Sequence, residues 1–162
     1  MTDIKSMNME ELKELMVQIG EKPFRAKQIY GWLHEHLVTS YDEMANIPKS
    51  LKEKLKDYPI TALEELDVQT SKVDGTRKYL FRLSDGNMIE SVLMRYKYGN
   101  SVCISSQAGC RMGCRFCAST IGGLTRNLLP SEMLDQIYRI QTSSYFPERS
   151  RFLLSGSADP FR

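Results

Sequence analysis

Three cysteines lie close together in the chain, at Cys110, Cys114 and Cys117. Spacings of three and then two intervening residues allow the three thiols to converge on one small volume. Structural zinc sites more often use paired Cys-x-x-Cys arms with four ligands, whereas three close thiolates suit an iron–sulfur cubane whose fourth iron is open to a small ligand. The spacing therefore favours a cluster with an open iron, where chemistry can take place.

A fourth cysteine, Cys103, lies seven residues before Cys110 on an expected strand. A four-cysteine zinc site remains an alternative, although a strand fixes the direction of a side chain more than a loop does. The other interpretation is a free, functional thiol activated by positive surroundings. No acidic residue occurs between Glu90 and Glu132. The basic residues of this segment could surround the cysteines with positive charge, or they could equally belong to an ordinary basic surface loop. These basic residues are Arg95, Lys97, Arg111, Arg115 and Arg126.

Length and composition place the chain among ordinary intracellular proteins. It has 162 residues, 41% hydrophobic and 26% charged, with a formal net charge of +2. No stretch approaches the roughly 20 apolar residues of a membrane span, and the N-terminus does not resemble a secretory signal. We expect a soluble, cytoplasmic protein whose cysteines are kept reduced, which disfavours a structural disulfide. The chain is too short for a full barrel enzyme.

The first part of the chain, residues 1–62, predicts a compact helical domain. Asn8 with Glu11 predicts a capped helix start, and Gly20 a stop. A second helix is expected from about Pro23, and a third over residues 48–58. Four lysines on this third helix give it a basic face: Lys49, Lys52, Lys54 and Lys56.

The next part, residues 63–98, changes to the alternating pattern of a small β-meander bounded by Asp-Gly turns. Its last strand, residues 87–96, places Glu90 on one face with Met88, Val92 and Met94. A carboxyl group among apolar neighbours could have a raised pKa and act as a base near neutral pH. The alternative is a charge on an edge strand that discourages aggregation.

The last part, residues 99–162, predicts a βαβ unit. A strand over residues 101–106 precedes the cysteine loop, a helix is expected over 129–142, and a second strand over 152–154. Parallel α/β folds gather their active sites at the carboxyl ends of strands. The cysteines are therefore expected at such an end, and Gly122-Gly123 gives their loop room to fold back.

The cysteine pattern, with Phe116 just before the last cysteine, resembles the signature of the radical S-adenosylmethionine superfamily. The wider stretch Ser101-Val-Cys-Ile-Ser-Ser-Gln-Ala-Gly-Cys-Arg-Met-Gly-Cys-Arg-Phe-Cys-Ala118, followed by Gly122-Gly-Leu-Thr-Arg-Asn-Leu128, is similar to bacterial methyltransferases that act on adenine C2 of 23S rRNA and tRNA. The N-terminal Pro23-Phe-Arg-Ala-Lys-Gln-Ile-Tyr30 and Ile47-Pro-Lys-Ser-Leu51 resemble that family's helical accessory domain. The likeness covers about residues 8 to 145.

The resemblance implies that Cys110, Cys114 and Cys117 hold a [4Fe-4S] cluster whose open iron chelates S-adenosylmethionine. An external electron donor would reduce the cluster, and the resulting 5′-deoxyadenosyl radical would activate a methyl group carried by a C-terminal cysteine. Adenine C2 is neither acidic nor nucleophilic, so a radical carrier solves a problem that polar methyl transfer cannot. The implied partners are 23S rRNA and tRNA, with no membrane and no second copy of the chain.

The resemblance also assigns single residues. Glu90 matches the family's proton acceptor, and Cys103 matches the thiol that forms a disulfide to release the product. Phe116, Ala158 and Asp159 fall at positions expected to contact S-adenosylmethionine. The last two replace the Gly-Glu of the family's Gly-x-Gly-Glu-Pro stretch, since this chain reads Gly-Ser-Ala-Asp-Pro over residues 156–160.

The implied fold is an α+β N-terminal part, made of the helical accessory domain and the β-meander, followed by the first βαβ portion of a partial (β/α)6 barrel. The remaining barrel strands and the methyl-carrying cysteine are not in the sequence, so we expect the isolated chain to be an inactive, truncated fragment. An unfinished parallel sheet would also expose an apolar edge. The alternative functions are methylation of adenine C8 by the same chemistry and a non-catalytic metal-binding or RNA-binding module.

Overall fold

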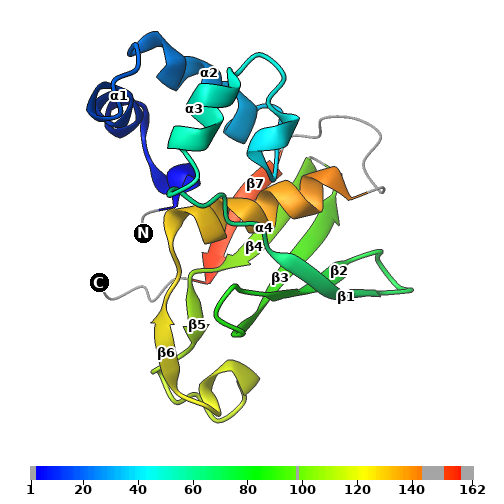
Figure 1. The fold of residues 1–162 in the computed structure, drawn as a ribbon. Helices are drawn as coiled ribbons and strands as arrows, with labels where there is room; N and C mark the ends of the chain where they lie inside the picture. The colour runs from blue at the N-terminus through cyan, green and yellow to red at the C-terminus, as the bar shows by residue number, and fades with distance from the viewer. Residues whose placement is uncertain (1–2, 98, 144–151, 158–162) are drawn as a thin grey trace. The chain divides into compact units, whose positions relative to one another are not determined.

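The structure is a computed structural model that describes residues 3–97, 99–143 and 152–157. The chain divides into two compact units, Met1–Ala62 and Leu63–Arg162. Figure 1 shows helices in the first unit and a mixed sheet with one long helix in the second. The second unit includes both the β-meander and the segment that follows residue 98, because strands from both parts belong to one sheet.

The first unit consists of short helices whose starts and stops are encoded locally. The Asn8 side chain accepts hydrogen bonds from the backbone N–H groups of Glu10 and Glu11, and Glu11 accepts from the N–H of Asn8. This arrangement is the predicted capping box. Gly20, at φ +73°, follows the helix end. The elements are η1 Ile4–Ser6, α1 Met9–Gln18, α2 Phe24–His34, η2 Tyr41–Glu43 and α3 Lys49–Lys54.

Apolar side chains from all of these helices form one core. Ten of its members are Ile4, Leu12, Leu15, Met16, Ala26, Ile29, Leu33, Met44, Leu51 and Leu55. The buried Asp3 carboxylate closes the unit, since it accepts hydrogen bonds from the N–H of Lys5 at 2.7 Å and of Thr61 at 2.8 Å. The third helix is shorter than the predicted 48–58. Its last turn loosens at Leu55, whose N–H is shared between Leu51 and Lys52.

The second unit is built on a five-stranded sheet with the order β1-β2-β3-β4-β7. Strands β1 to β4 pair antiparallel, and β7 pairs parallel to β4. The connection between these two strands contains the β5 and β6 strands and then helix α4, so β4–α4–β7 is a parallel βαβ unit. The bounds are β1 Glu64–Thr70, β2 Arg77–Arg82, β3 Met88–Tyr96, β4 Gly99–Ser105, α4 Pro130–Thr142 and β7 Phe152–Ser157.

One buried glutamine joins α4 to the sheet. The Gln136 side chain accepts hydrogen bonds from the Ser91 hydroxyl at 2.7 Å and the Ser105 N–H at 2.8 Å, and it donates to the Ser105 carbonyl at 2.9 Å. The surrounding core includes Tyr79, Phe81, Leu93, Val102 and Ile140. A buried amide that is fully paired in this way fixes the helix against the end of β4.

A separate two-stranded hairpin carries the cysteine loop, which Figure 1 draws between β5 and β6. Its strands are β5 Gln107–Gly109 and β6 Leu124–Asn127, with the short η3 Ala118–Thr120 inside the loop. The cysteines therefore follow this added hairpin strand rather than β4 itself. No helix among the described residues is long and apolar enough to cross a bilayer.

Candidate radical and cluster-binding site

Gly109 and Gly123 lie close together where the cysteine loop leaves β5 and returns to β6. Gly109 has φ +75°, and a Cβ atom there would collide with the carbonyl oxygen of Gly123. The same carbonyl accepts a hydrogen bond from the N–H of Cys110 at 3.1 Å. Only glycine fits this position, because it combines a left-handed backbone with a close approach of two chains. The sequence predicted room for the loop at Gly122 and Gly123, but it did not reveal the role of Gly109.

Inside the loop, Thr120 holds the turn that contains two of the thiols. Its hydroxyl lies 3.0 Å from the carbonyl oxygen of Cys114 and 2.8 Å from that of Cys117. The N–H of Cys117 also donates to the carbonyl of Cys114 at 3.1 Å. The backbone of the Cys-x-x-Cys turn is therefore defined by its own hydrogen bonds and by the Thr120 hydroxyl, whose single hydrogen is shared between the two carbonyl oxygens.

All four cysteines are free thiols and partly exposed. Within the described residues, no three His, Cys, Asp or Glu side chains are arranged to hold a metal ion. The loop nevertheless fits an iron–sulfur cluster in its donor set, because three accessible thiols share one closed loop and Cys103 lies outside it on β4. Cys110, Cys114 and Cys117 are the residues that would hold the cluster.

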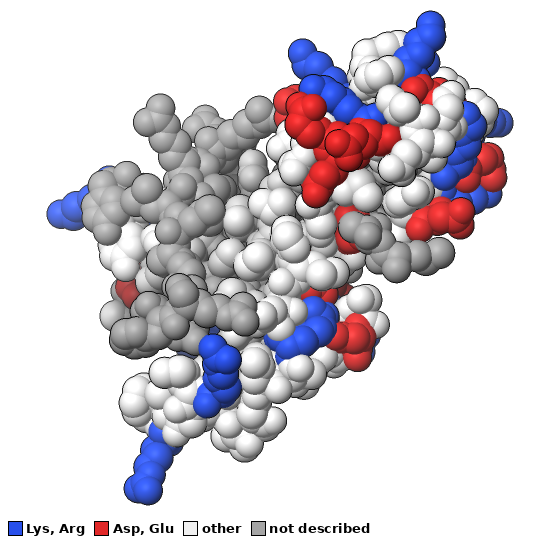
Figure 2. Space-filling view, turned by 90° about the vertical axis from the view of Figure 1, so that its left-hand side faces the viewer, with Lys and Arg blue, Asp and Glu red and all other residues white. Residues whose placement is uncertain are grey.

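The surroundings of the loop carry positive charge. Arg111 and Arg115 are exposed within it. On the face shown in Figure 2, the lower end of the molecule displays Lys and Arg side chains without Asp or Glu. Positive charge attracts anionic ligands.

Three apolar side chains of the loop are exposed: Met112, Phe116 and Ile121. Phe116 is 94% exposed, so its ring is available to a ligand that occupies the loop. The two other predicted S-adenosylmethionine contacts, Ala158 and Asp159, lie outside the described residues.

Glu90 and Cys103 lie on one face of the sheet. Val92 pairs with Cys103 across β3 and β4, and Glu90 is two residues from Val92, so the two side chains are diagonal neighbours. The Ser105 hydroxyl donates to the Glu90 carbonyl oxygen at 2.7 Å, which fixes the two strands at this point. The structure thus brings together the predicted base and the predicted resolving thiol.

The environment of Glu90 differs from the expected apolar one. Its side chain is 52% exposed, and one carboxylate oxygen lies 3.0 Å from the ammonium nitrogen of Lys78. Strand β3 lies inside the sheet, although its pairing with β4 begins at Val92, so at Glu90 the backbone pairs with β2 alone. Lys78 was not identified from the sequence, because only the strand register places it beside Glu90.

Arg126 links three elements around the loop. Its guanidinium binds both carboxylate oxygens of the buried Glu132 at 2.7 and 2.8 Å, and its Nε donates to Asp85 at 2.6 Å. The hydrogen bond from Arg126 lowers the pKa of Asp85 to about 2. Glu132 also accepts from the N–H of Leu129 at the start of α4. The sequence identified Arg126 only as a positive charge, and its structural role emerges from the fold.

Comparison with solved structures gives the class of protein. The chain matches the crystal structure of a radical SAM methyltransferase from Sphaerobacter thermophilus with a TM-score of 0.78 and 38% identity, over 87% of this chain and 42% of the other. The described fold thus matches part of a radical SAM methyltransferase.

Comparison with curated proteins is more specific. Residues 2–60 match the family model of the ribosomal RNA large subunit methyltransferase N-terminal domain. The chain is 60% identical over 99% of its length to a probable dual-specificity RNA methyltransferase RlmN from Lachnospira eligens, and 59% identical over 98% to that from Lachnoclostridium phytofermentans. It spans 46% and 44% of these relatives, or about half of their length. The chain is a homologue of the RlmN methyltransferases along nearly its whole length.

Proposed function

We propose that this chain provides the cluster-binding and RNA-recruiting parts of a radical S-adenosylmethionine enzyme that methylates C2 of adenine in 23S rRNA and tRNA. The observation that carries the proposal is the closed three-cysteine loop, in a chain 60% identical to an RlmN relative. In this proposal, the β4–α4–β7 unit is the first part of a (β/α)6 barrel. The TM-score of 0.78 to a radical SAM methyltransferase supports that assignment.

Two sets of residues would bind the two cofactors. Cys110, Cys114 and Cys117 would ligate a [4Fe-4S] cluster, while Phe116, Ala158 and Asp159 would contact S-adenosylmethionine. When bound, such a cluster supplies an electron for radical chemistry at an unactivated carbon. Three protein ligands would leave one iron open to S-adenosylmethionine, and Arg111 and Arg115 in the loop would attract its carboxylate.

Glu90 and Cys103 would act on the same sheet face. Glu90 would accept the proton that leaves adenine C2, since its carboxylate is exposed and held in place by Lys78. Cys103 would form the disulfide that releases the product, with its thiol free and accessible. The partner in this disulfide would be the methyl-carrying cysteine of the family. None of the four cysteines of this chain is assigned that role.

The first unit would recruit RNA. Residues 2–60 match the N-terminal domain of ribosomal RNA methyltransferases, and α3 carries lysines along its length. Lysine contacts to phosphates supply affinity without sequence preference. We further propose that the protein acts in the cytoplasm as a monomer and receives electrons from an external donor.

Anaerobic reconstitution with iron and sulfide tests the proposed cluster. We expect the 162-residue chain to bind about four irons with a broad brown chromophore. Cys110→Ser, Cys114→Ser and Cys117→Ser should each abolish this absorption. Cys103→Ser is the matched control, because it removes a thiol outside the loop and should leave the iron content unchanged.

Two results would contradict the proposal. One tightly bound zinc per chain would favour a metal-binding module, and an equal requirement for Cys103 would favour a four-cysteine zinc site. If the cluster forms, RNA methylation can be assayed with a polypeptide as long as the relatives. The position of the methyl group on the modified adenosine then distinguishes C2 from C8 methylation. We expect 2-methyladenosine.

A further inference from the structure

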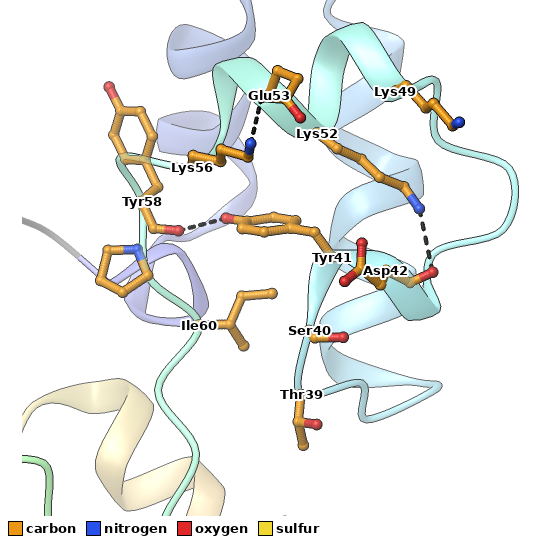
Figure 3. Close-up of a pocket in the computed structure, with 11 residues that line it drawn as sticks. Thr39, Ser40, Tyr41, Asp42, Lys49, Lys52, Glu53, Lys56, Tyr58 and Ile60 are labelled. Atoms are coloured by element: carbon orange, nitrogen blue, oxygen red, sulfur yellow. Dashed lines mark hydrogen bonds and ion pairs between the residues drawn. The ribbon is translucent and has the colours of Figure 1, made fainter.

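A pocket of about 620 Å³ lies within the first unit, far along the sequence from the cysteines. Its walls come from η2, α3 and the segment that follows α3, as Figure 3 shows. This volume is in the range of sites that hold small molecules or single nucleotides. The lining residues are Thr39, Ser40, Tyr41, Asp42, Lys49, Lys52, Glu53, Lys56, Tyr58, Pro59 and Ile60.

Two lysines of this pocket carry charges that no carboxylate neutralises within the described residues. The Lys52 ammonium group donates only to the backbone carbonyl of Asp42, at 3.3 Å, as drawn in Figure 3. Lys49 is exposed at the start of α3 and has no ion pair there. By contrast, Lys56 is paired with Glu53 at 2.5 Å. The pocket therefore offers two ammonium groups that can bind an anion.

Tyr41 provides a flat surface between these lysines and the apolar side of the pocket. Its hydroxyl donates to the backbone carbonyl of Tyr58 at 2.6 Å, which holds the ring across the pocket in Figure 3. Burial raises the pKa of Tyr41, so the phenol stays neutral at physiological pH. Pro59 and Ile60 complete the apolar side. A fixed aromatic ring in a pocket that is also lined by two lysines suits a planar base attached to a phosphate.

We propose that this pocket binds one unstacked nucleotide of the RNA substrate, with the base on Tyr41 and a phosphate on Lys49 and Lys52. The inference rests on the proposed RNA-directed function and goes further by naming the subsite and the form of the ligand. The whole pocket lies within the residues that match the rRNA methyltransferase N-terminal domain. The Asp42 carboxylate also lines the pocket and can accept a hydrogen bond from a ribose 2′-hydroxyl, which DNA lacks.

Binding of a fluorescent single-stranded RNA to the 162-residue chain, followed by anisotropy at several salt concentrations, tests the proposal. The double variant K49A/K52A should bind about tenfold more weakly, and its plot of log K against log salt should be shallower by about 0.7 for each phosphate that is no longer bound. The matched control is K22A/K27A, which removes two exposed lysines outside the pocket and should change affinity less than about twofold.

Tyr41 variants test the aromatic part of the site. Tyr41→Phe keeps the ring and should retain most of the affinity, whereas Tyr41→Leu should weaken binding by about fivefold or more with an unchanged salt slope. A DNA of the same sequence should bind more weakly than the RNA, and Asp42→Ala should reduce this preference. Circular dichroism of each variant separates a loss of binding from a loss of folding. The K49A/K52A variant changes no residue of the apolar core, so it tests the site even if a Tyr41 variant fails to fold.

The outcomes distinguish this inference from the function on which it rests. Unchanged RNA affinity in K49A/K52A, or an equal loss in K22A/K27A, overturns the nucleotide pocket while leaving the cluster and RNA recruitment in place. Failure of the unmodified chain to bind RNA at any salt overturns RNA recruitment itself. Iron reconstitution does not depend on these lysines and reports on the cluster separately.

Discussion

Gly109 and Gly122 lie at the two ends of the cysteine loop but have different surroundings. A Cβ atom at Gly109 would strike the Gly123 carbonyl, and its φ of +75° is unfavourable for other residues, whereas a Cβ at Gly122 would meet open space. Gly109→Ala should therefore lower the free energy of unfolding by about 1–3 kcal/mol and reduce iron uptake. Urea denaturation and iron analysis measure both effects. Gly122→Ala is the control. Equal effects of the two changes would contradict the importance of the close approach between Gly109 and the Gly123 carbonyl.

The buried hydroxyl of Tyr79 has no hydrogen-bond partner among the described residues, although its ring is fully buried and stacks on Phe81 with centroids 5.8 Å apart. Tyr79→Phe keeps the ring and removes an unpaired polar atom. We expect the free energy of unfolding to stay equal or rise by about 1 kcal/mol, as measured by urea denaturation. Tyr41→Phe is the comparison, because it removes a hydroxyl that is paired with Tyr58 and should lose about 1 kcal/mol. A clear loss in Tyr79→Phe would contradict the prediction.

Single residues were predictable where their neighbours in the sequence determine their structure. The Asn8 cap depends on Glu11, three positions away, and both are visible in the sequence. Glu90 was assigned correctly to a strand face with Met88 and Val92, but its exposure was not predictable. Exposure and the ion pair with Lys78 depend on the register of β2 against β3, which alternation alone does not determine.

An ion pair network centred on Arg126 joins the β5–β6 hairpin to the turn before β3 and to α4. The pKa of Asp85, in the turn before β3, is lowered to about 2 from 3.8 because Arg126 on β6 donates to it. Since the folded pKa lies below the unfolded one, this pair contributes stability above about pH 4 and loses it as pH falls towards 2. Asp85→Asn should therefore flatten the decline of the free energy of unfolding between about pH 4 and 2.

Unfolding of both proteins by urea at several pH values measures this effect. Asp67→Asn is the matched control, because Asp67 is an exposed carboxylate on β1 that accepts a hydrogen bond from Gln69 rather than from a guanidinium. Its decline with acid should follow that of the unmodified chain. An Asp85→Asn curve parallel to the unmodified one would show that the pair with Arg126 does not stabilise the fold.

Elements with a strong local period were predicted well, and short elements formed by distant contacts were not. The alternating pattern between two Asp-Gly turns predicted β2, and the helix expected over residues 129–142 is α4. Strand β5 has only three residues, and it forms because β6, which follows the cysteine loop, returns beside it. No periodicity is visible in so short a strand, so the cysteines were expected directly after β4.

At the scale of the whole molecule, the buried apolar residues that the structure describes form two cores. The division falls between Ala62 and Leu63, where the apolar pattern changes from helical to alternating. The buried residues of the first core all precede this point, and those of the second all follow it. The sequence could place the change of period, but the number of cores became visible only when the long-range packing was known.

Two cores allow the two units to lose stability separately. Leu12 and Leu93 are each fully buried, one in each core. Replacing either by Ala should cost about 2–5 kcal/mol through the cavity that it leaves. Hydrogen exchange measured by mass spectrometry should show that Leu12→Ala increases exchange within residues 1–62 and leaves the five-stranded sheet protected. Leu93→Ala should increase exchange in that sheet and leave residues 1–62 protected. Increased exchange throughout the chain in either variant would mean that the units unfold together, because local opening follows cooperative units rather than sequence distance.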